Sequence, residues 1–348
     1  MGTVAGAHVA IAGAGVFGLA TALALARAGL RVTVFDPAAL GTNASGVAAG
    51  MLAPASEALF DDGAAVHLAL LRRARDLWPD FVAGLGIEIV RNGVCIEGEA
   101  NWLAAVAARR WALGLPDDSA AGGLWLDEDW RLDSRAALSA LRAAAKALGV
   151  IFQPTGIADF IKGTLTLCTG ATMRVDALVV ATGASERGGH LAPETIVLSP
   201  IKGQILRLAG GLDNGPVLRG AGVYVCPDAR PLVGATMEAG RDDLTPDPVQ
   251  TAPLLSAAAR LRPDLATASA TIEVGVRAAT PDGLPLVGWS ARPGVILAVG
   301  ARRNGWLLAP LVAGVVAAYL TDKDPGPDAA RLDARRFDRE PEADAKQG

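Results

Sequence analysis

Residues 9–29 read VAIAGAGVFGLATALALARAG, and no charged residue precedes Arg27 in this stretch. Its length would permit a membrane-spanning helix. The residues before it contain no lysine or arginine, so the charged leader of a secretory signal is missing. Gly13, Gly15 and Gly18 instead fall within it at G-x-G-x-x-G spacing. The stretch therefore predicts a phosphate-binding turn between a strand and a helix.

The surrounding sequence supplies the strand, turn, helix and second strand that this motif requires. Gly13 permits the tight turn, Gly15 lets the backbone approach a pyrophosphate, and Gly18 lets the helix pack closely on the strand. The helix N-terminus would then face the phosphates. The second strand ends in Asp36, which is placed to accept hydrogen bonds from a ribose. We interpret residues 9–36 as a dinucleotide-binding unit; the alternative is a buried apolar helix in a chain rich in glycine and alanine.

The composition is that of a folded globular protein. The chain has 348 residues, of which 51% are hydrophobic and 20% charged, enough for one large or two ordinary domains. A net charge of −4 favours neither nucleic acid nor an anionic membrane as a partner. Cys95, Cys168 and Cys226 lie far apart, which argues against a disulfide framework and fits a reducing compartment. Without a targeting segment, the chain is expected in the cytoplasm.

Residues that bind metals do not cluster in the sequence. The three histidines lie far apart, and the cysteines form no C-x-x-C motif. Three adjacent aspartate pairs, Asp61–Asp62, Asp117–Asp118 and Asp242–Asp243, fall in loop-like sequence, where we expect solvated carboxylates. We therefore predict no metal site.

Later segments alternate between the patterns of a nucleotide domain and those of a sheet. Residues 200–277 contain alternating segments typical of an antiparallel sheet. Strand–glycine units recur near Gly183 and Gly300, so a nucleotide domain would be assembled from separated segments. Such an assembly favours a large, permanently bound cofactor, hence FAD over NAD. The pattern further predicts a hairpin turn at Asn92–Gly93 and helices over residues 61–84, 133–149, 248–263 and 306–320.

Several motifs are more specific in combination than the opening glycines. They are SGVAAGMLAPASE, LDSRAALSALRAAAKALGV, LVVATGA, SPIKGQILRL, YVCPDARPLVGATMEAG, GVRAATPDGLPLVG and GARRNGWLLAP. With these motifs the chain resembles, over residues 9–320, the D-amino-acid oxidase superfamily of flavoproteins, and more closely the glycine oxidases of thiamine biosynthesis. The resemblance implies an α/β, Rossmann-like FAD-binding domain of the glutathione-reductase type, assembled from separated segments. It also implies an α+β substrate domain built on an antiparallel sheet.

The resemblance further implies how the chain is divided. Residues 335–348 are expected to form a loose tail. The family tends to assemble, which leaves a homo-oligomer open. The FAD-binding domain is expected over residues 1–79, 131–196 and 278–334, and the substrate-binding domain over residues 80–130 and 197–277.

The same resemblance assigns residues to FAD. The glycine turn and Asp36 are expected to hold the ADP half, with Ile157 touching adenine and Gly183 against the nucleotide. The backbone N–H groups of Asn304 and Gly305 are expected to face flavin N1 and C2=O, where a helix N-terminus stabilises the negative charge of reduced flavin. The full cofactor-binding set is Gly13, Gly15, Val16, Phe17, Gly18, Asp36, Ser45, Ala48, Ala49, Gly50, Met51, Ile157, Gly183, Arg303, Asn304 and Gly305.

The residues nearest the reaction are assigned in the same way. Residues 45–50 are expected along the pyrophosphate and ribityl chain, with Met51 beside the isoalloxazine. Arg277, at the end of a strand, is expected to clamp a carboxylate bidentately. The Tyr224 hydroxyl would add a third hydrogen bond, and Arg303 a positive field near the flavin and the carboxylate. The alternatives are a solvated strand-end Arg277 and a Tyr224 that merely packs.

The resemblance implies oxidation of glycine, sarcosine or a D-amino acid without a side-chain base. Hydride passes from Cα to flavin N5, and the imine hydrolyses to a 2-oxo acid. Dioxygen or another acceptor then reoxidises the flavin, with hydrogen peroxide as product if the protein is an oxidase; thiamine biosynthesis is one context. The alternatives are a D-amino-acid dehydrogenase that passes electrons to a quinone or partner protein, a flavoprotein subunit of a hetero-oligomer, and a plain NAD-binding protein.

Three residues depart from the glycine oxidase pattern. Ala301 and Arg302 stand where those enzymes often carry a histidine and an aromatic residue, and Asp228 stands where they often carry a basic residue. An alanine opens space, and a second arginine favours an acidic group. We therefore expect a pocket that accepts a larger or acidic substrate.

Overall fold

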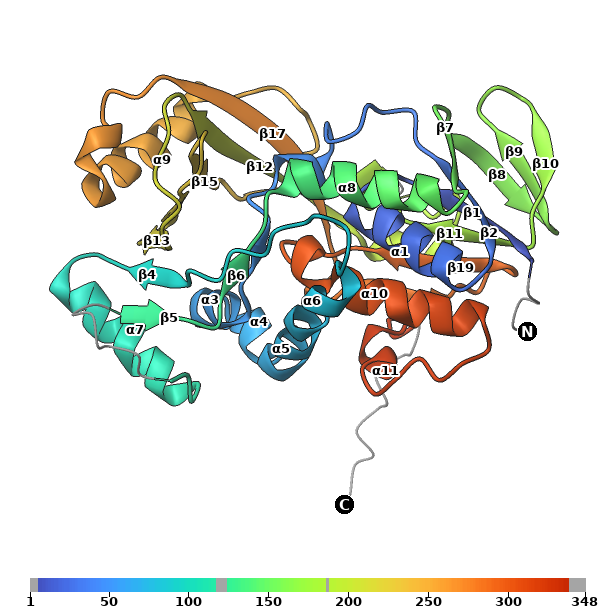
Figure 1. The fold of residues 1–348 in the computed structure, drawn as a ribbon, viewed down its shortest axis with the longest axis horizontal. Coiled ribbons are helices and arrows are strands. Elements are labelled where there is room, and N and C mark those ends of the chain that lie inside the picture. The colour runs from blue at the N-terminus through green and yellow to red at the C-terminus, as the bar shows by residue number, and fades with distance from the viewer. Residues whose placement is uncertain (1–5, 117–123, 186–187, 338–348) are drawn as a thin grey trace, which may run out of the picture.

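Two β-sheets of different construction organise the chain (Figure 1). The computed structural model describes residues 6–116, 124–185 and 188–337. One sheet is mostly parallel and is flanked by long helices, whereas the other is mostly antiparallel and lies at the opposite end of the molecule. This arrangement confirms the predicted fold class, an α/β cofactor domain with an α+β domain beside it.

The mostly parallel sheet has the strand order β18-β19-β11-β1-β2-β7. β1, β2, β7, β11 and β19 pair in parallel, and β18 runs antiparallel to β19 at one edge. Its strands come from three separated parts of the chain, as predicted for this domain. They are β1 (His8–Ala12), β2 (Arg31–Phe35), β7 (Ile151–Gln153), β11 (Ala177–Val180), β18 (Leu286–Trp289) and β19 (Val295–Val299).

Alternate residues of β1 belong to two different cores. Val9 and Ile11 pack with helices α1, α8 and α10, whereas Ala10 and Ala12 pack with a three-stranded sheet of β8, β9 and β10. Successive side chains of a strand point to opposite faces, so the parallel sheet is covered on both sides. The covering elements are α1 (Val16–Arg27), α8 (Ser134–Ala147), α10 (Gly305–Leu320), β8 (Ile157–Ile161), β9 (Thr164–Leu167) and β10 (Thr172–Arg174).

The apolar stretch of residues 9–29 is divided between β1 and α1 by the turn that contains Gly13. α1 begins after Gly15, and a capping bond from Gly29 N–H to the Ala26 carbonyl closes its far end. Among the helices that the structure describes, none combines the length and the apolar character that a membrane span needs.

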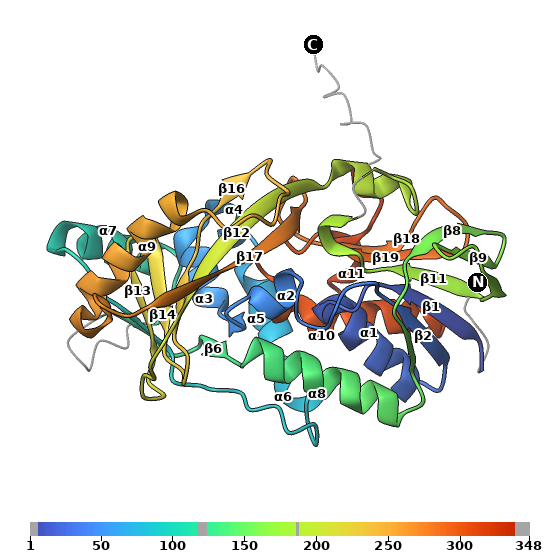
Figure 2. The same cartoon turned by 90° about the horizontal axis from the view of Figure 1, so that it is seen from above.

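The antiparallel sheet has the order β16-β12-β15-β14-β13-β4-β5, and β17 pairs with β12 from Ser199↔Ala279 to Leu208↔Ala270. Helix α9 (Pro248–Leu261) packs on one face. Figure 2 shows β12 and β17 running from the side of α9 toward the helices of the parallel sheet. The strands are β4 (Val94–Ile96), β5 (Leu124–Leu126), β12 (Ser199–Leu208), β13 (Val217–Gly220), β14 (Val223–Cys226), β15 (Leu232–Gly234), β16 (Glu238–Ala239) and β17 (Ala270–Ala279).

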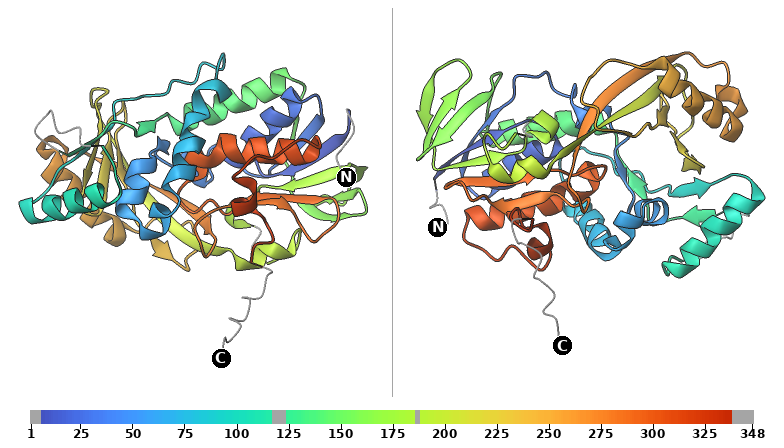
Figure 3. Two further views of the ribbon diagram at one scale, coloured as in Figure 1. Left: turned by 90° about the horizontal axis from the view of Figure 1, so that it is seen from below. Right: turned by 180° about the vertical axis from the view of Figure 1, so that it is seen from behind.

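The single helix predicted over residues 61–84 is wrong. The chain forms short helices there, and Val66 and Leu77, two of the apolar positions that predicted the helix, are 72% and 42% exposed. Pro79 lacks the N–H that would continue the helix past Asp76. The longest of these short helices, α5, lies against α10 (Figure 3). The pieces in this region are α3 (Pro54–Phe60), α4 (Asp62–Ala65), α5 (Leu68–Asp76) and α6 (Trp78–Phe81).

The hairpin predicted at Asn92–Gly93 is also wrong, because the strand that follows it, β4, pairs with β5 and β13 rather than with the preceding residues. The other predicted helices are present as α8, α9 and α10. The remaining elements are α2 (Ala44–Val47), β3 (Met51–Leu52), β6 (Trp130–Arg131), α7 (Ala100–Ala112) and α11 (Ala329–Leu332).

The carboxyl end is anchored beyond the point where a loose tail was expected to begin. Arg336 donates from Nε and Nη2 to the two carboxylate oxygens of Asp282, each at 2.8 Å. Its Nη1 also donates to the Pro285 carbonyl at 3.0 Å. Residues 338–348 of the expected tail lie outside the described residues.

Candidate active site

The glycine turn between β1 and α1 leaves no room for side chains. A Cβ at Gly13, where φ is +105°, would lie 2.4 Å from the Ala181 carbonyl oxygen. A Cβ at Gly18 would lie 1.9 Å from the Gly13 carbonyl oxygen. Gly15 is the N-cap of α1, and a Cβ there would meet Ser45 Oγ at 3.3 Å. Gly13 and Gly18 are therefore required by close backbone contacts, and Gly15 keeps the helix N-terminus accessible.

Two side chains hold this turn in place. Asp36, just after β2, accepts the Ala14 N–H at 2.7 Å. Ser45 of α2 accepts the Val16 N–H at 3.0 Å through Oγ, which satisfies one donor of the first turn of α1. Asp36 and Ser45 also line the cavity beside the turn. Each therefore both fixes the turn and faces the space where a ligand would lie.

A cavity of about 510 Å³ opens beside the turn, and we call it the glycine-loop cavity. Residues from both ends of the chain line it, because the start of α10 lies next to the start of α1. The two places expected to hold opposite ends of one cofactor thus face the same space. The predicted residues that line this cavity are Gly13, Gly15, Val16, Phe17, Asp36, Ser45, Ala48, Gly183, Arg303 and Gly305.

Helix α10 directs its N-terminus at the two cavities. The Asn304 N–H already donates to the Ala301 carbonyl at 2.8 Å. Gly305 and Trp306 are the first residues of α10, and N–H groups in a first turn have no acceptor within their helix. The Trp306 ring is fixed by donation from Nε1 to the Ser45 carbonyl at 3.0 Å. The first turn of α10, rather than Asn304, therefore offers free donors and the partial positive charge of a helix N-terminus.

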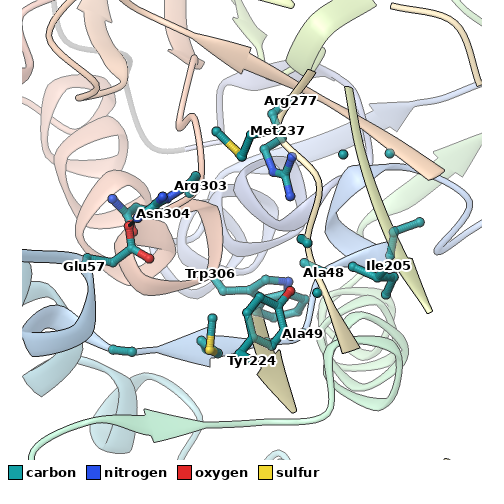
Figure 4. A pocket seen from close by; sticks show the side chains of 18 of the residues that line it. Ala48, Ala49, Glu57, Ile205, Tyr224, Met237, Arg277, Arg303, Asn304 and Trp306 are labelled. Atoms are coloured by element: carbon teal, nitrogen blue, oxygen red, sulfur yellow. Dashed lines mark hydrogen bonds and ion pairs between the residues drawn. The ribbon is translucent and has the colours of Figure 1, made fainter. Parts of the chain in front are cut away.

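A second cavity of about 340 Å³ adjoins the first, and we call it the arginine cavity (Figure 4). The two cavities have in common the lining residues Ala44, Ala48, Gly275, Arg277, Arg303 and Trp306. The predicted residues that line the arginine cavity are Ala48, Ala49, Gly50, Met51, Tyr224, Arg277, Arg303 and Asn304. The structure therefore brings together the residues expected at the flavin and those expected at the substrate.

Two glycines make room for the side chains expected to bind substrate. A Cβ at Gly203 would lie 1.9 Å from Arg277 Nη1, and a Cβ at Gly234 would lie 2.2 Å from the Tyr224 hydroxyl oxygen. Arg277 Nη1 is buried without a hydrogen-bond partner among the described residues. Burial lowers the pKa of Arg277 and raises the pKa of Tyr224. Because arginine nevertheless stays protonated in proteins, Arg277 is a half-buried cation on the cavity wall with its Nη1 buried, not a solvated strand end.

Glu57 of α3 is a site residue that the sequence analysis missed. Its Oε2 accepts Arg303 Nε at 3.0 Å and Arg303 Nη2 at 2.6 Å, and the residue is 7% exposed (Figure 4). Burial acts to lower the pKa of Arg303, but the Glu57 carboxylate outweighs it, so that pKa is raised. The charge of Arg303 is therefore balanced by Glu57, which weakens the positive field expected from it.

Arg302 is paired as well. Its Nη1 lies 2.5 Å from Asp61 Oδ2, and the Asp61 side chain is 11% exposed. The expectation of a solvated carboxylate is thus wrong for Asp61, whereas the Asp62 side chain is 91% exposed. Since Asp61 balances it, Arg302 supplies no unpaired charge that would favour an acidic substrate.

The two other aspartate pairs differ in outcome. Asp243 is not simply solvated, because its Oδ1 accepts a hydrogen bond from the fully buried Lys202 Nζ at 2.6 Å. Asp117–Asp118 lies outside the described residues.

Ile157 of β8 packs against the core beneath the parallel sheet and lines neither cavity, so its contact with adenine stays a prediction. Within residues 6–116, 124–185 and 188–337, no three histidine, cysteine or acidic side chains converge as metal ligands.

We expect Glu57→Gln to lower the free energy of unfolding of the FAD-bound protein by about 2 kcal/mol, because a buried guanidinium loses its charged acceptor. Urea denaturation would measure the change. Asp62→Asn is the matched control: this neighbouring carboxylate is 91% exposed and pairs with Arg109 at 2.6 Å on the surface, so the loss of its charge should change stability by less than about 0.5 kcal/mol. Equal stability of Glu57→Gln and the unmodified protein would contradict a structural role for the Glu57–Arg303 pair.

Comparison with protein families gives a match over nearly the whole chain. The family model described as "FAD dependent oxidoreductase" matches residues 8–319. Those residues include the glycine turn, both arginines expected near the substrate, and the start of α10. The match therefore covers both cavities.

Curated relatives and solved structures agree with this match. The glycine oxidase of Geobacillus kaustophilus is 31% identical over 94% of this chain and 96% of its own length. The bifunctional protein ThiO/ThiG of Trichormus variabilis is 31% identical over 95% of this chain, and this chain spans about half, 55%, of that protein. A crystal structure of glycine oxidase from Geobacillus kaustophilus superposes with a TM-score of 0.80 at 27% identity, covering 95% of this chain and 99% of that one.

Proposed function

The chain belongs to the family of FAD-dependent oxidoreductases, and from this premise we propose that it acts on CH–NH groups and oxidatively deaminates a small amino acid in the arginine cavity. The observation that carries the proposal is Arg277. Its guanidinium lines both cavities, and Nη1 is buried without a partner among the described residues. Such a group suits a substrate carboxylate, which would supply the missing counter-ion next to the cofactor.

The residues present fit FAD. The cramped glycine turn and Asp36 would hold the ADP half in the glycine-loop cavity, and the first turn of α10 would face the flavin where the two cavities meet. When bound, FAD supplies an acceptor for the hydride that leaves the substrate carbon, so that it gains two electrons. The chain itself therefore has to position the substrate and to keep a complementary electrostatic field.

The side chains of the arginine cavity set the protonation and position of the substrate. Arg277 would hold the carboxylate bidentately, and Tyr224, whose pKa burial raises, would stay a hydroxyl and donate a hydrogen bond. Glu57 is the one carboxylate among the described lining residues, and Arg303 occupies it. The amine would therefore bind neutral. As the C–H bond breaks, the nitrogen releases a proton to solvent, and water hydrolyses the imine to a 2-oxo acid and ammonia.

A comparison of amino acids with matched amines tests this proposal. We expect the purified protein to convert glycine, sarcosine or D-alanine at a kcat/KM at least about 100-fold above methylamine or ethylamine, which lack the carboxylate. The 2-oxo acid would be quantified under air, together with ammonia from glycine or D-alanine and methylamine from sarcosine. Equal kcat/KM for the amines would show that Arg277 does not select the substrate.

The electron acceptor requires its own measurement. We propose dioxygen, because glycine oxidase relatives match this chain along nearly their full length. One hydrogen peroxide per 2-oxo acid is then expected under air. Turnover only with a quinone would instead identify a D-amino-acid dehydrogenase, and activity only after addition of another protein would identify a subunit of a hetero-oligomer.

A further inference from the structure

Arg219 is a second cation in the arginine cavity without a counter-ion. It lies on β13, and its side chain lines the cavity. The guanidinium carbon lies 4.3 Å from the centroid of the Phe60 ring. Among the described residues, no carboxylate forms an ion pair with it and no side-chain hydrogen bond satisfies it. The sequence analysis did not single out this residue, because a lone arginine in a short strand gives no local signal.

Arg219 and Arg277 lie on one face of the antiparallel sheet. Strand pairing places Arg219 opposite Tyr224, Tyr224 opposite Gly234, and Gly234 opposite Ile205. Arg277 lies on the next strand, β17. Ile205 lies opposite Glu273, and Arg277 is four residues further along β17. Residues directly opposite in paired strands share a face, and so do residues an even number apart in one strand, so the two arginines lie on the same face with four strand spacings between them. Tyr224 and Gly234 therefore lie between the two arginines on this face of the sheet.

No neighbouring carboxylate of the described residues pairs directly with Arg219. Glu57 and Asp61 are already engaged by Arg303 and by Arg302. Burial lowers the pKa of Arg219, the Glu57 carboxylate acts to raise it and Arg303 acts to lower it by repulsion; the pKa is lowered overall, but an arginine remains protonated. A substrate with a single carboxylate would neutralise Arg277 and would leave Arg219 without a paired anion elsewhere in the cavity.

Two other partners for Arg219 are weaker explanations. The Phe60 ring recovers by a cation–π contact only part of the cost of holding the half-buried charge of Arg219 away from water. The FAD pyrophosphate is expected at the glycine turn, and Arg219 does not line the glycine-loop cavity. A second anionic group on the substrate meets both objections, since it would lie in the cavity that Arg219 does line.

We propose that Arg219 binds a second carboxylate, so that the preferred substrates are amines with two carboxylates, such as D-aspartate or iminodiacetate. This inference rests on the proposed amine oxidation and keeps its chemistry: the same C–H bond breaks, and the same imine is hydrolysed. The second arginine that the sequence analysis sought in Arg302 is, on this account, Arg219.

Matched substrate pairs test the inference. D-aspartate differs from D-alanine, and iminodiacetate from sarcosine, by one added carboxylate. The ratio of kcat/KM within each pair should exceed about 10 for the unmodified protein and should fall about 100-fold in Arg219→Met. Arg91→Met is the control, because Arg91 also stacks on an aromatic ring, Trp130 at 4.4 Å, but lies outside both cavities. An Arg219→Met ratio equal to that of the control would overturn the inference.

A binding measurement separates this inference from the proposed function. Succinate and propionate differ by one carboxylate and have no amine, and their binding to the FAD-bound protein can be followed by the flavin absorbance. Succinate should bind at least about 10-fold tighter than propionate, and Arg219→Met should remove the difference. If no amine is oxidised while this difference depends on Arg219, the proposed function fails, whereas the binding of a second carboxylate by Arg219 stands. If amines are oxidised but Arg219→Met leaves the affinity of succinate relative to propionate unchanged, the inference alone fails.

Discussion

Replacing Arg277 by methionine is expected to lower kcat/KM for a small amino acid by about 10³-fold while FAD stays bound. The substrate carboxylate would lose two charge-assisted hydrogen bonds, and the amine would no longer be held against the cofactor. The FAD content should persist because the glycine turn and the first turn of α10 do not depend on this side chain. Steady-state kinetics with glycine, sarcosine and D-alanine, together with the flavin absorbance, would measure both.

The conservative variant Arg277→Lys separates charge from geometry. An ammonium keeps the positive charge but cannot donate bidentately, so an intermediate kcat/KM is expected. The planar Arg277 guanidinium also fills the space above Gly203, and the ammonium group of a lysine does not have the shape to fill it. If Arg277→Met retained kcat/KM within a factor of a few, Arg277 would not be the carboxylate-binding group.

Gly18→Ala is expected to release FAD and to lower stability by about 3 kcal/mol or more, because the new Cβ would lie 1.9 Å from the Gly13 carbonyl oxygen. Neither backbone can move without opening the turn that faces the glycine-loop cavity. The FAD-to-protein ratio after gel filtration and the urea midpoint would report the two effects.

Gly314→Ala is a matched control for that variant. Gly314 also lies within a helix, α10, but a Cβ there meets nothing within 4 Å. This change should retain FAD and stabilise the protein by about 0.5–1 kcal/mol, as usual for glycine to alanine in a helix. Equal FAD content in the Gly18→Ala and Gly314→Ala variants would show that the close contact at Gly18 is not needed for the cofactor.

The cofactor half of the site is predictable from local sequence. Gly13 and Gly15 lie between a strand and a helix, and Gly18 lies in the first turn of that helix, so a motif of a few residues fixes the turn. The placement of Asp36 after the second strand is equally local. The start of α10 follows from a glycine turn before a long apolar segment. The structure adds that these distant parts of the chain face one cavity.

The substrate half depends on pairings that no local pattern records. Arg277 was identified through the resemblance, and its guanidinium has room only because Gly203, on another strand, carries no side chain. Glu57 and Arg219 were missed, since Glu57 becomes a site residue only when Arg303 from the far end of the chain reaches it. The prediction of a single helix over residues 61–84 failed for a different reason: a proline and exposed apolar residues interrupt that helix.

Anaerobic mixing of the FAD-bound protein with a small amino acid tests the central claim most directly. If the arginine cavity presents an amino acid to the cofactor of the neighbouring cavity, the oxidised-flavin absorbance should bleach on addition of substrate, and a matched amine without a carboxylate should leave it unchanged. If dithionite bleaches the flavin but no amino acid with one or two carboxylates does, the two cavities do not form an amine-oxidising site.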